Sequence, residues 1–214
     1  MTRLPAEVQL VIIADAGFAG PNRVVQLIQA ALPEKGGSRV IVVERDKRPA
    51  SEQNDQERLE RLKALRQLTR KQGVALVVNQ RLDLAIASNA DGIHLPERGL
   101  PLDAVRSIAP HLWIGRSCHD AEGLKRAEEA GADWAFLSPI ASPFSKTTSL
   151  PPIGVDTFGL LVSQRCIPVF ALGGVTEKLV SPLLNAGAQG VAVIGHVLGA
   201  EDPRRAAAKL LGDC

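Results

Sequence analysis

Eight short apolar runs, each followed by a longer helical pattern, constrain the fold of this chain most strongly. The runs are QLVIIAD, RVIVVERD, VALVVN, GIHLP, WIGRS, WAFLSP, PVFALGG and GVAVIG. Their apolar residues are continuous rather than alternating with polar ones, which is typical of parallel strands that are covered on both faces. Eight βα units predict an α/β fold with a closed (β/α)₈ TIM barrel, and a doubly wound open sheet is the alternative.

Length and composition predict a single domain over residues 1–214. The chain has 214 residues, of which 45% are hydrophobic and 22% charged, enough for one large core. The net charge of +2 and the 3% aromatic content favour neither a nucleic-acid partner nor an anionic membrane. We therefore expect neither of these partners.

The cysteines and the apolar runs bear on localisation. Cys118, Cys166 and Cys214 have no CxxC spacing, which favours a reduced, cytoplasmic compartment. No apolar segment approaches the length of a bilayer-spanning helix. Near the N-terminus, the apolar core VIIA is short and ends at Asp15, so we expect a first strand there rather than a signal peptide.

Glycines follow the seventh and eighth runs, at the end of a barrel where reacting groups lie. Gly173 and Gly174 end one strand, and Gly195 ends the other. Backbone N–H groups from both loops could form one anion pocket, and phosphate sites are common after these two strands. The alternative is that each glycine only terminates its strand. The occurrence of glycine on both strands favours the phosphate interpretation.

At these two strand ends and over most of the rest of its length, the chain resembles the thiamine phosphate synthases and the related thiazole tautomerases. The resemblance rests on VFALGGVT, NAGAQGVAVIGHVL, ERDK, VVNQRLDLAIASNADGIHLPE, IGRSCH and SPIASPFSKT, which occur in the family's order over most of the chain. It implies one of two activities. A synthase joins a pyrimidine diphosphate to a thiazole phosphate and releases pyrophosphate with the help of Mg²⁺, whereas a tautomerase shifts a proton and a double bond in a thiazole carboxylate phosphate.

Site residues follow from this resemblance. It implies that Arg45, Lys47 and Lys146 bind the diphosphate, with Ser145 as a hydroxyl donor. On the pyrimidine side it implies Asn79 and Ser117, and for the thiazole phosphate it implies the backbone N–H groups of Gly173, Gly174, Ile194 and Gly195. Without the resemblance, the three basic residues fit a solvated surface equally well.

Several positions depart from the family pattern. Gln80 and Gly99 stand where the synthases have aspartates that bind Mg²⁺, and an amide or a glycine lacks the charge that this cation prefers. Val43 replaces a glutamine, and Pro143 replaces a threonine. Glu97 and Asp83 are candidate replacements for the lost ligands. We therefore predict no metal site, and expect Mg²⁺ only if coupling activity is retained.

These departures favour the tautomerase branch, which needs an acid–base group beside a phosphate pocket and no metal. The resemblance implies a histidine after strand six in the tautomerases, but this chain has Pro139 there, so that assignment does not transfer. His119 is the leading catalytic candidate because it follows strand five and imidazole titrates near neutrality. His94 and His196 are alternatives, each with a structural interpretation. Lys146 is the second catalytic candidate.

The predicted function is a thiamine-biosynthesis enzyme that binds a small phosphorylated heterocycle, a thiazole phosphate with or without a pyrimidine diphosphate. One alternative is another phosphate-barrel isomerase or epimerase. A second is a non-catalytic module that binds a phosphorylated ligand and has a regulatory role. A homodimer is compatible with such barrels, but no sequence feature locates an interface.

Overall fold

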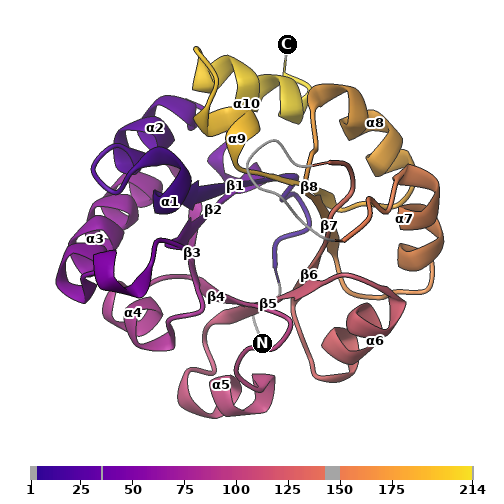
Figure 1. The fold of residues 1–214 in the computed structure, drawn as a ribbon, viewed down its shortest axis with the longest axis horizontal. Helices are drawn as coiled ribbons and strands as arrows, with labels where there is room; N and C mark the ends of the chain where they lie inside the picture. The colour runs from indigo at the N-terminus through magenta and orange to yellow at the C-terminus, as the bar shows by residue number, and fades with distance from the viewer. Residues whose placement is uncertain (1–3, 35, 143–149, 214) are drawn as a thin grey trace.

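The computed structural model describes residues 4–34, 36–142 and 150–213 and contains a closed barrel of eight parallel strands (Figure 1). The strands pair in sequence order, and the last closes on the first. They are β1 (Leu10–Asp15), β2 (Val40–Arg45), β3 (Ala75–Asn79), β4 (Gly92–Leu95), β5 (Trp113–Cys118), β6 (Trp134–Leu137), β7 (Val169–Leu172) and β8 (Gly190–Val193). The predicted barrel is confirmed, and the open doubly wound sheet is wrong.

Helices surround the barrel as an outer ring (Figure 1). They are α1 (Ala16–Ala19), α2 (Val24–Ala31), α3 (Asp55–Gln72), α4 (Leu82–Ala87), α5 (Leu102–Ile108), α6 (Ala121–Glu129), α7 (Val155–Val162), α8 (Glu177–Asn185), α9 (Gly195–Leu198) and α10 (Pro203–Leu211), with 3₁₀ turns η1 (Gly37–Arg39) and η2 (Ala50–Glu52). The longest, α3, begins at the capping side chain of Asn54 and ends at Gly73 in the left-handed conformation. None of the helices in the described ranges is both long and apolar enough to cross a membrane.

The inside of the barrel is filled at its N-terminal end. A layer of buried apolar side chains lies there, which we call the lower layer: Val11, Ile41, Val77, Trp134 and Phe170. Gly115 makes room for the Trp134 indole, because a Cβ at that position would lie 2.2 Å from the ring. Leu4 and Val8 extend this core, and the Gln189 amide donates to the carbonyls of Ala6 and Val8. Any cavity must therefore open at the other end of the barrel.

A buried group of charged residues fixes α3 against β2, just outside the barrel. Glu44 on β2 is fully buried and accepts hydrogen bonds from Arg58 and Arg61 on α3. Arg61 also bonds Asp46, 2.9 Å away. Both carboxylates need these partners because an unpaired buried charge is costly. The pairs hold the end of β2 and the chain that follows it, where Arg45 and Lys47 lie.

Candidate active site

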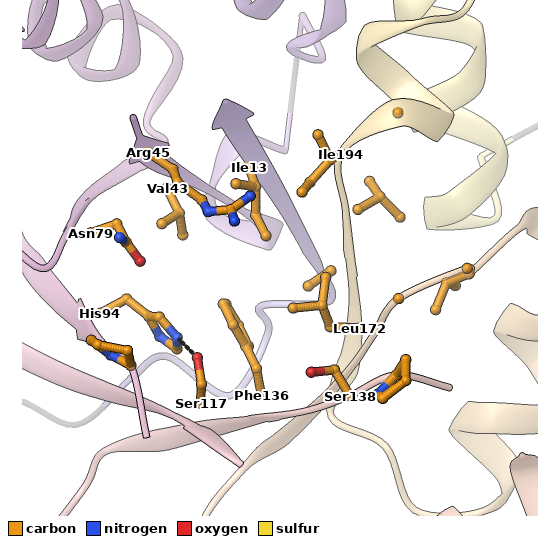
Figure 2. Close-up of a pocket in the computed structure, with 18 of the residues that line it drawn as sticks. Ile13, Val43, Arg45, Asn79, His94, Ser117, Phe136, Ser138, Leu172 and Ile194 are labelled. Atoms are coloured by element: carbon orange, nitrogen blue, oxygen red, sulfur yellow. Dashed lines mark hydrogen bonds between the residues drawn. The ribbon is translucent and has the colours of Figure 1, made fainter. Parts of the chain in front are cut away.

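A cavity of about 340 Å³ opens at the C-terminal end of the barrel, and every strand contributes to its lining (Figure 2). Its apolar lining includes Ile13, Val43, Phe136, Leu172 and Ile194. Four of these residues lie on the strands themselves, and each points into the barrel two positions after a residue of the lower layer: Ile13, Val43, Phe136 and Leu172. Such walls suit a flat ring, and a cavity of this size suits a small ligand.

Three consecutive strands, β3 to β5, give the cavity its polar wall, formed by Asn79, His94 and Ser117, which we call the polar arc (Figure 2). His94 Nε2 lies 2.8 Å from Ser117 Oγ. The imidazole also stacks on Phe136, with ring centroids 4.2 Å apart. Burial lowers the pKa of His94 to about 3, and the charges of Arg116 and Arg45 act in the same direction. His94 is therefore neutral at physiological pH.

On the opposite side, the cavity is bordered by the glycine rim, which we define as Gly173 and Gly174 after β7 with Ile194 and Gly195 after β8. Gly173 and Gly174 have φ angles of 93° and 66°. A Cβ on Gly174 would lie 2.7 Å from the backbone of Ala141. The strand-six loop therefore passes too close to Gly174 for a side chain, which explains why glycine stands there.

The same rim also has the features that an anion site requires. Within the described part of the chain, the Gly174 N–H has no hydrogen-bond partner. Successive backbone N–H groups in such turns form concavities that attract anions. The close approach that requires glycine is thus compatible with an anion site at the rim. The phosphate role of the rim stays a prediction.

The predicted diphosphate residues are only partly described. Arg45 and Lys47 both line the cavity. Arg45 forms an ion pair with Asp15 at the end of β1, and Lys47 Nζ lies 3.0 Å from Gln80 Oε1. Ser145 and Lys146 lie outside the described residues, so their predicted roles stay predictions.

His119, which lines the cavity, is held at its rim by a hydrogen bond to the chain after β6. Its Nδ1 lies 2.7 Å from the carbonyl oxygen of Ser138. A carbonyl only accepts hydrogen bonds, so Nδ1 carries a proton, and Nε2 of the neutral ring has a lone pair. His196 also lines the cavity, but its Nε2 is paired with Glu177 at 2.9 Å. The hydrogen bond therefore fixes the orientation of the His119 ring at the cavity rim, and its catalytic role stays a prediction.

The structure places the residues on which the Mg²⁺ prediction rests. Gly99 does not line the cavity, and a Cβ there would lie 3.2 Å from the guanidinium of Arg116. Asp83 is exposed and bonded to Arg81. Glu97 lines the cavity but pairs with Arg126 at 3.3 Å. Across residues 4–34, 36–142 and 150–213, no cluster of three or more candidate metal ligands is present, and the expectation about Mg²⁺ stays a prediction.

Sequence reasoning missed most of the apolar lining and several side-chain partners of the site. Ile13, Phe136 and Leu172 were not singled out, although each lies at an inward position two residues beyond a lower-layer residue. That alternation is the signal that identifies them. The Asp15 partner of Arg45 and the Gln80 partner of Lys47 have no comparable signal, because the pairs join different strand ends.

Comparisons with known proteins agree with this geometry. A family model described as "Thiamine monophosphate synthase" matches residues 10–197. A putative thiamine-phosphate synthase of Geobacter sulfurreducens is 36% identical over 203 residues, covering 94% of this chain and 92% of that protein. A thiamine-phosphate synthase of Chloroflexus aurantiacus is 33% identical over 202 residues, covering 94% of this chain and 90% of its own.

Among solved structures, thiamine phosphate pyrophosphorylase from Pyrococcus furiosus superposes with a TM-score of 0.83. It is 31% identical, and the match covers 97% of this chain and 96% of that chain. The resemblance inferred from the motifs is therefore confirmed, and this thiamine-phosphate synthase-like chain belongs to the thiamine monophosphate synthase family.

Proposed function

We propose that this chain binds a thiazole phosphate in the barrel cavity and catalyses proton transfer on its ring, with His119 as the acid–base group. The observation that carries this proposal is the hydrogen bond of 2.7 Å between His119 Nδ1 and the Ser138 carbonyl. It fixes the imidazole at the cavity rim with its second nitrogen available as a base.

The cavity offers complementary surfaces to the two ends of such a ligand. A thiazole ring fits against Ile13, Val43 and Leu172, whose side chains line the cavity. Its phosphate fits the glycine rim, where the Gly174 N–H has no partner among the described residues. Arg45 and Lys47 line the same cavity and supply positive charge for a second anionic group such as a ring carboxylate.

The chemistry requires no change of oxidation state. Nε2 of His119 takes a proton from the thiazole carboxylate phosphate, and the electron pair of the broken C–H bond moves the ring double bond. The imidazolium then returns the proton at a second ring position, which regenerates neutral His119. The Ser138 carbonyl stabilises the charged intermediate form of the ring because it accepts the Nδ1 proton in both states.

Coupling of a pyrimidine diphosphate to a thiazole phosphate is the second candidate, because the relatives are named thiamine-phosphate synthases. That reaction releases pyrophosphate, for which Mg²⁺ supplies charge neutralisation. The carboxylates near the cavity do not fit the ion: Glu97 is paired with Arg126, and position 80 carries an amide. We therefore rank coupling below proton transfer.

Two assays on the purified chain separate these candidates. In D₂O, NMR would follow isomer interconversion and deuterium incorporation in thiazole carboxylate phosphate, with and without a chelator. A second reaction would contain pyrimidine diphosphate, thiazole phosphate and Mg²⁺, with thiamine phosphate detected by chromatography. We expect chelator-insensitive proton transfer and no coupling.

A matched histidine pair identifies the base. His119→Asn should slow proton transfer by about 100-fold or more, whereas His111→Asn, at an exposed position that does not line the cavity, should leave it unchanged. Efficient Mg²⁺-dependent coupling would overturn the proposal. Thiazole phosphate binding without either reaction would support the non-catalytic alternative, and failure to bind any thiazole would favour another phosphate-barrel isomerase or epimerase.

A further inference from the structure

His196 connects three helices beside the glycine rim. It lies on α9, directly after Gly195, and lines the cavity. Its Nε2 lies 2.9 Å from the Glu177 carboxylate at the start of α8, and Lys209 of α10 lies 3.6 Å from the other oxygen of that carboxylate. The three helices are neighbours in the outer ring (Figure 1). These contacts therefore join the segments that follow β7 and β8, from which the rim is built.

The glycine rim has no charged side chain of its own. It consists of three glycines and Ile194, so it offers an anion only backbone N–H groups. Arg45 and Lys47 also line the cavity, but they lie at the end of β2 and in the segment after it. A phosphate ester carries about −1.5 to −2 charges at pH 7. A titratable side chain that directly follows the rim, as His196 does, is therefore placed to supply positive charge there.

The contact with Glu177 determines which nitrogen of His196 is free. A carboxylate oxygen only accepts hydrogen bonds, so Nε2 carries a proton whether the ring is neutral or charged. Within the described residues, Nδ1 has no hydrogen-bond partner. Nδ1 is an acceptor in the neutral ring and a donor in the charged ring. Because the oxygens of a phosphate dianion only accept hydrogen bonds, Nδ1 can bind one only after it takes up a proton.

The charges around the ring favour this proton. The pKa of Glu177 is lowered by a hydrogen bond from its own backbone N–H and by the charges of Lys209 and His196, so the carboxylate is ionised and stabilises an imidazolium. Among the described residues, Glu177 is the charged group that contacts the ring, and Lys209 contacts that same carboxylate. Lys209 thus offsets the negative charge that Glu177 would otherwise present to a bound anion. A dianion at the rim then favours the protonated ring further.

We propose that His196 is a phosphate-binding residue that takes up a proton when the ligand binds, and that Glu177 positions it. The proton comes from solvent and is held on Nδ1, which donates to a phosphate oxygen at the rim. The site therefore selects a ligand with a phosphate dianion, and its affinity for the dianion increases as the pH falls through the range in which histidine titrates. This inference rests on the proposed phosphate site but does not depend on proton transfer by His119.

Sulfate is the probe, because it stays a dianion throughout the range in which histidine titrates. Any change in the number of bound protons then belongs to the protein and not to the ligand. Calorimetry near neutral pH, in buffers of different ionisation enthalpy, counts the protons that are taken up. We expect the wild type to take up a fraction of one proton, and to bind sulfate about five- to tenfold more weakly at about pH 8.5 than at about pH 6.

Three variants assign the proton. His196→Asn should bind sulfate as weakly as the wild type does at high pH and should take up no proton. His119→Asn, which removes the other histidine of the cavity rim, should retain the uptake. Glu177→Gln keeps an acceptor for Nε2 but removes the charge that stabilises the imidazolium, so its pH profile should move to lower pH. A purely structural role of the pair would leave that profile unchanged.

The outcomes separate this inference from the proposed phosphate site. Sulfate binding without proton uptake in the wild type, or uptake that persists in His196→Asn, would overturn the inference and leave the phosphate site supported. An unchanged pH profile in Glu177→Gln would refute the role of Glu177. If the wild type bound no sulfate at any pH, the phosphate site and the inference would both be wrong. A thermal melt of each variant confirms that the barrel is folded.

Discussion

The two ends of the barrel interior are built by the same strands, with inward-facing residues only two positions apart, yet they differ in character. Val11, Ile41 and Trp134 belong to the packed lower layer. Two residues further along their strands, Ile13, Val43 and Phe136 line the open cavity. On β4 and β5, the glycines Gly92 and Gly115 are followed at the same spacing by His94 and Ser117. Stability is thus concentrated at the lower end, and polar groups that can act on a ligand are concentrated at the upper end.

The largest effect should come from filling the space that Gly115 leaves in the lower layer. Gly115→Ala places a Cβ 2.2 Å from the Trp134 indole, and we expect the free energy of unfolding to fall by about 3 kcal/mol. Denaturant titration measures this change. The atoms in the clash belong to the six-membered ring and Nε1 of the indole. Trp134→Phe should therefore partly restore the stability of the Gly115→Ala variant. If the two changes in the free energy of unfolding simply added, the clash would be relieved elsewhere.

A change at the glycine rim should affect ligand binding and leave stability nearly unchanged. Gly195 is the first residue of α9, so its backbone is one that other residues adopt. Gly195→Asp places a negative charge beside the proposed phosphate and should weaken the binding of thiazole phosphate by about 100-fold or more. Gly195→Asn has the same shape without the charge and is the control. Equal affinities in the two variants, measured by calorimetry, would place the phosphate elsewhere.

The smallest expected effect concerns the strained backbone at the border of the upper end. Gln80 has a φ of 71°, and its N–H donates to the His94 carbonyl at 2.9 Å, which holds that conformation. Gln80→Gly should raise the free energy of unfolding by about 0.5–1 kcal/mol because glycine adopts this conformation without strain. Gln80→Ala keeps the strain and is the control. If both variants had the stability of wild type, the strain would have no energetic consequence.

The fold and much of the cavity lining were predictable because both follow from local patterns. Continuous apolar runs identified the strands, and the ends of those strands had to meet at one face. Arg45, Asn79, Ser117, His119 and the glycine rim accordingly all line the cavity. Their roles toward a ligand stay predictions.

The partners of those residues were not predictable, because each pair joins segments that only the closed barrel brings together. His94 was considered as a histidine with a structural hydrogen bond, but its partner Ser117 lies on the next strand and 23 positions away. The arginines of α3 stand in a mostly polar segment, yet Arg58 and Arg61 are buried against Glu44. No periodicity within a single segment encodes such pairings.

The barrel, the position of its reactive face and the residue types available there follow from the amino-acid sequence, since they depend on alternation along each strand and on the order of strands and helices. Three features follow from tertiary contacts: the proton on His119 Nδ1, the pairing of Glu97 with Arg126, and a buried His94 with one nitrogen unpartnered among the described residues. Hydrogen bonds and pKa values depend on distances of a few ångströms between different strands, and the barrel register fixes those distances.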